Sequence, residues 1–245
     1  GVKGTEDAHL TVQGVFVEYA MARDLWDRLD KIKPTSKRNG AKRAFLAGYL
    51  ELPLDEADAI LRGFVSGSRV SQKKVHSPAR WGINSIFPNK DAFPHRRVPM
   101  MDVRKNACRL KWAFNVKPDI VIELKGKGIV CIEAKVESPE GRYASSRADK
   151  QALYGAFGTN EEADAFQKEE GRQCNVQRVL MQDILGYSSD RRHMVFLFLP
   201  TKPPSECAKD MKYVSWFDAF SCFQNSGRDT SDIATKMIDT LKEIK

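Results

Sequence analysis

The chain has 245 residues, of which 42% are hydrophobic and 29% are charged, and its formal net charge is +8 at pH 7. These values are typical of a soluble globular protein that is long enough to bury a core, and no run approaches the roughly 18 apolar residues of a membrane helix. The first residues lack the pattern of a secretory signal, and the five cysteines form no CxxC pair. We therefore expect reduced thiols and an intracellular protein, cytoplasmic in a prokaryote or associated with its nucleoid. Because the chain starts with Gly1, we also expect a processed chain or a fragment of a longer protein.

The first 105 residues are predicted to be a helical region followed by basic loops. Residues 5–32 have apolar side chains at helical spacing from Val15 onward, which predicts one or two helices that pack on the rest of the protein. Pro34 and Gly40 interrupt this pattern, so a second helix is expected over 41–50 and a third after residue 53.

Positive charge is concentrated in this first part of the chain. Residues 1–118 contain 22 Lys and Arg against 12 Asp and Glu, whereas residues 119–245 contain 18 against 20. Within the first part, residues 59–118 contain 13 basic and two acidic residues, a net charge of +11. Such a block indicates an anionic partner, first of all nucleic acid, with an acidic protein or a lipid surface as alternatives. The basic residues expected to contact phosphates are Arg69, Lys73, Lys74, Arg80, Arg96, Arg97, Arg104 and Lys105.

Residues 106–245 are predicted to form a core of the mixed α/β class. Strand character begins at 108–114 and is strongest over 119–124 and 129–136, which are joined by the turn sequence KGKG as in a β-hairpin. Further elements are expected in the order helices over 142–171 and 176–185, a buried strand over 194–199, the segment KYVSWFDAF, and a helix over 231–244.

The hairpin is predicted to bring two acids and a lysine together. A four-residue turn places Asp119 beside Ala134, whereas a three-residue turn places it opposite Glu133. In both registers the acids lie far from the turn, and strand alternation puts Glu133 and Lys135 on one face. The apolar runs on both strands indicate a central hairpin, where charged groups must be paired or bound to a metal. We therefore favour a divalent-cation site, with a surface salt bridge on an edge strand as the alternative.

Pro118-Asp119, thirteen further residues and Glu133-Ala134-Lys135 resemble the motif of the PD-(D/E)XK nuclease superfamily. The resemblance covers roughly residues 110–200 and implies a restriction-endonuclease-like core, with a central mixed sheet flanked by helices. It also implies an enzyme that hydrolyses phosphodiester bonds with Mg²⁺ or Mn²⁺. In that family the aspartate and the glutamate bind the metal and the lysine positions the attacking water. Those roles fall here to Asp119, Glu133 and Lys135, with the carbonyl of Ala134 as a further metal ligand.

Helix geometry singles out two more residues. At about 100° per residue, Glu18 falls in the middle of the apolar stripe of the first helix, where it needs a partner. Members of the family often supply one more acid from an N-terminal helix, so Glu18 is expected to be a metal ligand, or else to pair with a nearby Lys or Arg. Many relatives have a glutamine on the helix after the lysine motif, and Gln177, beside the apolar stripe, fits best. Gln151 and Gln182 are the alternatives.

These observations predict a Mg²⁺- or Mn²⁺-dependent endonuclease that acts on DNA, with a homodimer as a possible assembly. An endonuclease directed at RNA would use the same chemistry. Two alternatives from other classes are a nucleic-acid-binding module with weak or absent catalysis, and an interaction domain whose basic face binds an acidic protein. The chain contains no Walker-type loop and no GxSxG motif, so ATP dependence is not predicted.

Overall fold

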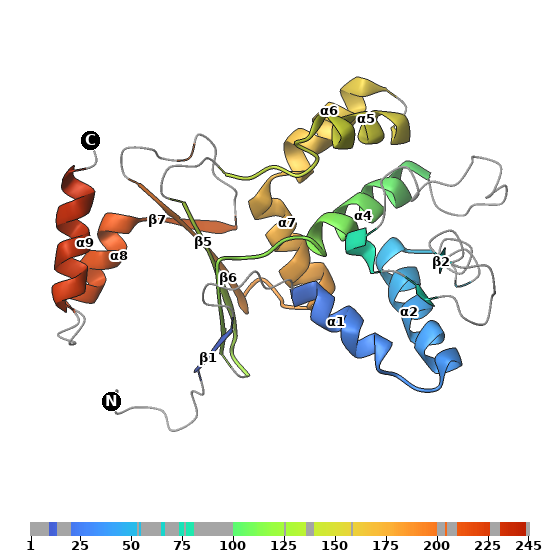
Figure 1. The fold of residues 1–245 in the computed structure, drawn as a ribbon, viewed down its shortest axis with the longest axis horizontal. Helices are drawn as coiled ribbons and strands as arrows, with labels where there is room; N and C mark the ends of the chain where they lie inside the picture. The colour runs from blue at the N-terminus through green and yellow to red at the C-terminus, as the bar shows by residue number, and fades with distance from the viewer. Residues whose placement is uncertain are drawn as a thin grey trace. The chain divides into compact units, whose positions relative to one another are not determined.

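The structure is a computed structural model that divides into two compact units, each described separately (Figure 1). The first, called the sheet unit, comprises residues 1–19, 118–140 and 187–245, and the second, called the helical unit, comprises 20–117 and 141–186. The predicted boundary between residues 105 and 106 does not coincide with this division, because it falls inside helix α4 (Met100–Ala113). The described residues are 10–13, 21–52, 54, 65–66, 74–75, 77–80, 100–124, 126–135, 140–157, 159–199, 204, 210–225 and 231–243.

The sheet unit is built on a mixed sheet of five strands in the order β1-β4-β5-β6-β7. The strands β1, β4 and β5 pair antiparallel, whereas β5, β6 and β7 pair parallel. This arrangement confirms the predicted α/β class with a mixed sheet. The strand bounds are Leu10–Gln13 (β1), Ile120–Leu124 (β4), Gly128–Ala134 (β5), Arg192–Phe198 (β6) and Met211–Ser215 (β7).

Strand β5 is central, because β4 pairs with one of its edges and β6 with the other. Its side chains Ile129 and Cys131 are buried, as expected for a strand with neighbours on both sides. The strand begins at Gly128, whose φ of +152° favours glycine, and a Cβ atom there would lie 2.2 Å from the backbone oxygen of Arg191. This close approach fixes the start of β5 against the segment that leads into β6.

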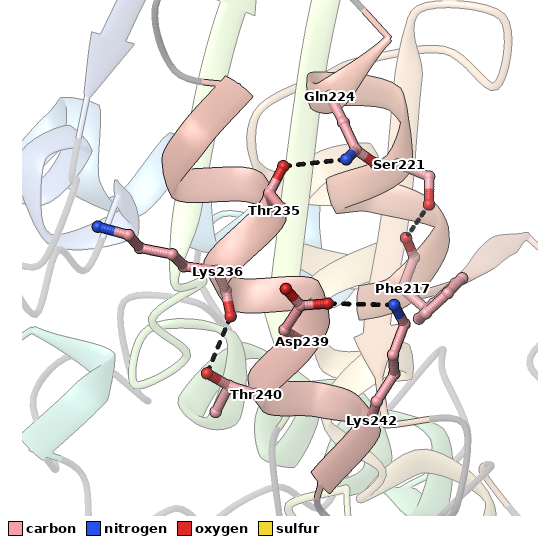
Figure 2. A network of polar contacts seen from close by, with 8 residues as sticks. All are labelled: Phe217, Ser221, Gln224, Thr235, Lys236, Asp239, Thr240 and Lys242. Atoms are coloured by element: carbon pink, nitrogen blue, oxygen red, sulfur yellow. Dashed lines mark hydrogen bonds and ion pairs between the residues drawn. The ribbon is translucent and has the colours of Figure 1, made fainter.

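Two helices complete the C-terminal part of the sheet unit, and they pack against each other (Figure 1). Helix α8 (Trp216–Gln224) follows β7 directly, and α9 (Ser231–Glu243) follows α8. Figure 2 shows Gln224, whose side-chain amide donates to the hydroxyl of Thr235 at 2.9 Å and so joins the two helices. The buried side chain of Ile238 adds an apolar contact surface to α9.

The helical unit packs its helices around an aromatic and aliphatic core. Trp26, Phe45 and Phe114 meet edge to face, with ring centroids about 6 Å apart, an arrangement that aromatic pairs favour. A short β2–β3 ladder pairs Val65–Ser66 with Lys74–Val75. The helix bounds, besides α4, are Met21–Asp30 (α1), Thr35–Leu50 (α2), Arg147–Ala156 (α5), Asn160–Glu170 (α6) and Gln173–Val179 (α7), which continues as a π-helical turn over Leu180–Ile184.

The strand predicted over 108–114 is wrong, because this segment is the second half of helix α4 and the residue that follows it. The buried side chains Val103, Ala107, Leu110 and Phe114 recur at intervals of four, three and four residues, which is the period of a helix buried on one face. The sequence HMVFLF, in contrast, forms β6 as expected.

The helix predicted over 5–32 is also wrong in part. Leu10–Gln13 forms strand β1, which covers the edge of β4 that faces away from β5, and α1 starts only at Met21. Helix α2 begins at Thr35, so the break between the first two helices ends at Pro34, and Gly40 lies inside α2. The third helix predicted after residue 53 lies outside the described residues except for residue 54.

In the part of the chain that the structure describes, no helix has the length and apolarity needed to cross a bilayer.

Candidate functional site

The register of the hairpin places the two predicted acids opposite each other. Leu124 pairs with Gly128 and Ile120 pairs with Ile132, so the turn has three residues and the four-residue alternative is wrong. One step beyond the last of these pairs, Asp119 lies opposite Glu133. Both residues therefore lie at the end of the β4–β5 hairpin that is far from the turn, as the sequence predicted.

At the end of the β4–β5 ladder, the side chain of Asp119 accepts a backbone hydrogen bond. The N–H of Lys135 donates to the carbonyl of Leu197 in β6 at 2.9 Å, so the N–H of the preceding Ala134 faces the other neighbour, β4. There it donates to Oδ2 of Asp119 at 2.7 Å. The carboxylate of Asp119 thus accepts this N–H in place of a backbone carbonyl of β4.

Two oxygen atoms at this end of the hairpin are outside the backbone ladder. The side chain of Asp119 is exposed, and its bond to Ala134 uses only Oδ2, so Oδ1 can bind a cation. The carbonyl of Ala134 points to the same edge as its N–H, toward Pro118, which has no N–H to donate to it.

Glu133 and Lys135 lie on the same face of β5 and form an ion pair between Oε1 and Nζ. The Glu133 side chain is 2% exposed and that of Lys135 is 19% exposed, so the pair is largely removed from water. Cys131 lies two residues before Glu133 on this face. Burial raises the pKa of the Cys131 thiol, and the negative charge of Glu133 raises this pKa further.

The predicted alternative of a surface salt bridge on an edge strand does not describe this pair, because β5 has a neighbour on each side and Glu133 is buried. A buried charge of this kind needs a compensating group, which Lys135 supplies. The oxygen donors of Asp119, Glu133 and Ala134 are also of the type that Mg²⁺ and Mn²⁺ bind. Among the described residues, no group of three or more His, Cys, Asp and Glu side chains is placed to hold a metal ion.

The other two predicted site residues do not lie in the described part of the sheet unit. Glu18, the predicted third acid, lies outside the described residues, so its role stays a prediction. Gln177 is fully buried on α7 of the helical unit, whereas Gln151 and Gln182 are exposed in the same unit. The burial agrees with the side of the helix that the sequence predicted for Gln177.

The predicted phosphate-binding residues are described only in part. Lys74 lies in β3, Arg80 ends the 3₁₀ turn Pro78–Arg80, and Arg104 and Lys105 lie half-buried on α4. All four belong to the helical unit. The other four, Arg69, Lys73, Arg96 and Arg97, lie outside the described residues.

The sequence did not reveal Trp216, which contacts the candidate site. Its indole N–H donates to the backbone carbonyl of Lys135 at 2.9 Å, across 81 residues of sequence. The local signal was only the pattern Ser215-x-x-Asp218, which predicts a capped helix start but not the contact that the tryptophan makes.

Comparison of the chain with protein-family models, with curated proteins and with solved structures found no match. The resemblance to the PD-(D/E)XK superfamily therefore stays a prediction from the sequence motif.

Proposed function

We propose that this chain is a metal-dependent nuclease that hydrolyses phosphodiester bonds, with DNA as its substrate. The observation that supports the proposal is the meeting of Asp119, Glu133 and Lys135 at the open end of a central hairpin. A buried glutamate and a lysine next to an exposed aspartate provide oxygen ligands and a positive charge within one small region. The restriction-endonuclease-like fold that the motif implies is part of this proposal.

Asp119, Glu133 and the carbonyl of Ala134 would hold Mg²⁺ or Mn²⁺, and Glu18 would supply a further carboxylate. When bound, such an ion lowers the pKa of a coordinated water and stabilises negative charge on a phosphate. Lys135 would orient the attacking water through its ammonium group and offset charge that develops on the phosphate oxygens. The ion pair with Glu133 restricts the position of this ammonium before substrate binds.

The basic block over residues 59–118 would bind phosphates of the nucleic-acid backbone. Its net charge of +11 favours a polyanion, and contacts of Lys and Arg with phosphates release counterions. Affinity should therefore fall steeply as the salt concentration rises.

The proposal is tested by incubating the chain with circular and linear DNA in Mg²⁺ or Mn²⁺, with EDTA as the control. Asp119→Ala and Lys135→Ala are assayed beside the wild type, and Lys212→Ala serves as a control at an exposed lysine of the same unit. We expect nicking or linearisation of circles at the full rate by the wild type and by Lys212→Ala, a much lower residual rate for Lys135→Ala, and no cleavage by Asp119→Ala. We also expect Asp119→Ala to retain DNA binding, because removal of a carboxylate reduces repulsion of the phosphates.

Undiminished cleavage by Asp119→Ala would contradict the assignment of the metal site. Digestion of linear DNA alone would indicate an exonuclease, and cleavage of matched RNA but not DNA would change the substrate to RNA. Binding of DNA without cleavage of any substrate would favour the binding module instead.

A further inference from the structure

Both backbone polar groups of Lys135 are held by other elements of the sheet unit. Its N–H donates to the carbonyl of Leu197 in β6, and its carbonyl accepts the indole N–H of Trp216, each at 2.9 Å. Lys135 follows the last residue of β5, so these two bonds extend the hydrogen-bonded backbone of the strand by one residue. The bond to Trp216 is the one supplied by a side chain, so a substitution can remove it.

Trp216 is itself fixed at the start of helix α8. The hydroxyl of Ser215, the last residue of β7, accepts the N–H of Asp218 at 3.0 Å and donates to its carboxylate at 2.7 Å. This is a capping arrangement that fixes the first turn of the helix. The indole also stacks on the ring of Phe220, one turn later, with ring centroids 5.5 Å apart and planes 19° apart. The direction of the indole N–H is therefore set by β7, by the cap and by the stack.

We infer that Trp216 is a positioning residue for Lys135. The inference rests on the proposed nuclease function, since it concerns the group that would orient the attacking water. A lysine side chain has four rotatable bonds, and a reacting group must be held to within about 0.5 Å of its productive position. Glu133 holds the ammonium end of Lys135, whereas Leu197 and Trp216 hold its backbone end. Loss of the indole donor leaves the backbone end held by one bond and so widens the range of positions of the ammonium.

The test replaces Trp216 by Phe, which keeps a ring that can stack on Phe220 but removes the N–H donor. Cleavage of circular DNA is measured over a range of DNA concentrations in Mn²⁺. We expect kcat to fall about three- to tenfold, the range that corresponds to one neutral hydrogen bond, with KM unchanged. The matched control is Phe217→Leu, a change at the exposed next residue of α8, for which we expect wild-type kcat and KM.

A double variant separates positioning from a general structural effect. In a Lys135→Ala background, Trp216→Phe should not lower the residual rate further, because the side chain that it positions is gone. If Trp216 supports the fold only, its substitution should reduce the residual rate by the same factor in both backgrounds. If Trp216→Phe does not fold, Ser215→Ala, which removes the helix cap, is assayed instead with the same expected loss in kcat at constant KM.

The outcomes distinguish this inference from the proposed function. If the wild type cleaves no nucleic acid, the nuclease proposal fails and the positioning role fails with it. If the wild type cleaves and Lys135→Ala cleaves much more slowly, but Trp216→Phe has wild-type kcat, only the positioning role is overturned. A rise in KM at unchanged kcat would also overturn it, since that result would place Trp216 in substrate binding.

Discussion

The ion pair between Glu133 and Lys135 can be tested by protein stability, without knowledge of the substrate. Lys135→Met keeps the unbranched apolar stem but removes the ammonium that compensates the Glu133 carboxylate. Breaking a fully buried pair costs about 3–5 kcal/mol. Because the Lys135 side chain is 19% exposed, solvent screens part of the interaction, and we expect the free energy of unfolding to fall by about 2–3 kcal/mol.

A bound divalent cation should reduce this loss, because it provides positive charge at the same carboxylates. A ligand that binds only the folded state stabilises it by about 2.7 kcal/mol at a concentration 100 times its Kd. Removal of the lysine ammonium also removes a positive charge that repels the cation. We therefore expect the deficit of Lys135→Met relative to the wild type to be smaller by about 1 kcal/mol or more in saturating Mn²⁺ than in EDTA.

The measurement is urea unfolding of the wild type and the variant in EDTA and in Mn²⁺, followed by circular dichroism. The control is Lys242→Met, which removes the same charge from the pair with Asp239 on α9, where both side chains are about 60% exposed (Figure 2). Exposed pairs contribute little, so we expect a change below about 0.5 kcal/mol in both buffers. If Lys135→Met loses no more than Lys242→Met, the reasoning about the buried pair is refuted, and an equal deficit in EDTA and Mn²⁺ would refute the cation site.

Three further predictions concern backbone geometry and charge. Gly128→Ala should lower the free energy of unfolding by more than about 1 kcal/mol, since its Cβ would lie 2.2 Å from a backbone oxygen. Gly126→Ala, whose Cβ would have no atom within 4 Å, should lower it less. Equal losses in thermal unfolding would contradict the steric argument. Glu51→Gly should raise the free energy of unfolding by about 0.5–1 kcal/mol, because residue 51 caps the C-terminus of α2 with a φ of 55°. Glu51→Ala should give no such gain. A gain from alanine would show that removal of the glutamate charge, and not the backbone conformation, is the cause. Neutralising four basic residues together should weaken DNA binding across sequences and flatten its salt dependence in gel-shift titrations, and unchanged binding would remove the basic block from the interface. These four residues are Lys73, Lys74, Arg96 and Arg97.

The hairpin could be predicted from the sequence because its signals are local. Apolar strands, a Gly-rich turn and a fixed spacing place Asp119 near Glu133 in either register, and only the turn length had to come from the structure. Strand alternation alone predicts that Glu133 and Lys135 lie on one face, and the structure adds the ion pair between them.

The elements that were mispredicted depend on contacts distant in sequence. Leu10–Gln13 forms a strand because β4 offers it an edge more than 100 residues later, which no local pattern shows. Residues 108–114 have the apolar and aromatic composition of a strand, and the buried residues earlier in α4, such as Val103, are needed to see the helical period. The bond from Trp216 to Lys135 depends on the order of the strands. Helix α8 follows β7, and β7 is placed near the end of β5 because both strands pair with β6.

The order of strands in the sheet also has a consequence for protein synthesis. Strand β5 follows β4 by a three-residue turn, but β6 follows β5 only after the 46 residues of the segment 141–186, which belong to the helical unit. A nascent chain on the ribosome can therefore form the hairpin early, whereas strand β6, which makes β5 central, and Trp216, which holds Lys135, emerge later. An incomplete chain that ends before Trp216 has the two acids and the lysine but lacks the indole bond to the Lys135 backbone.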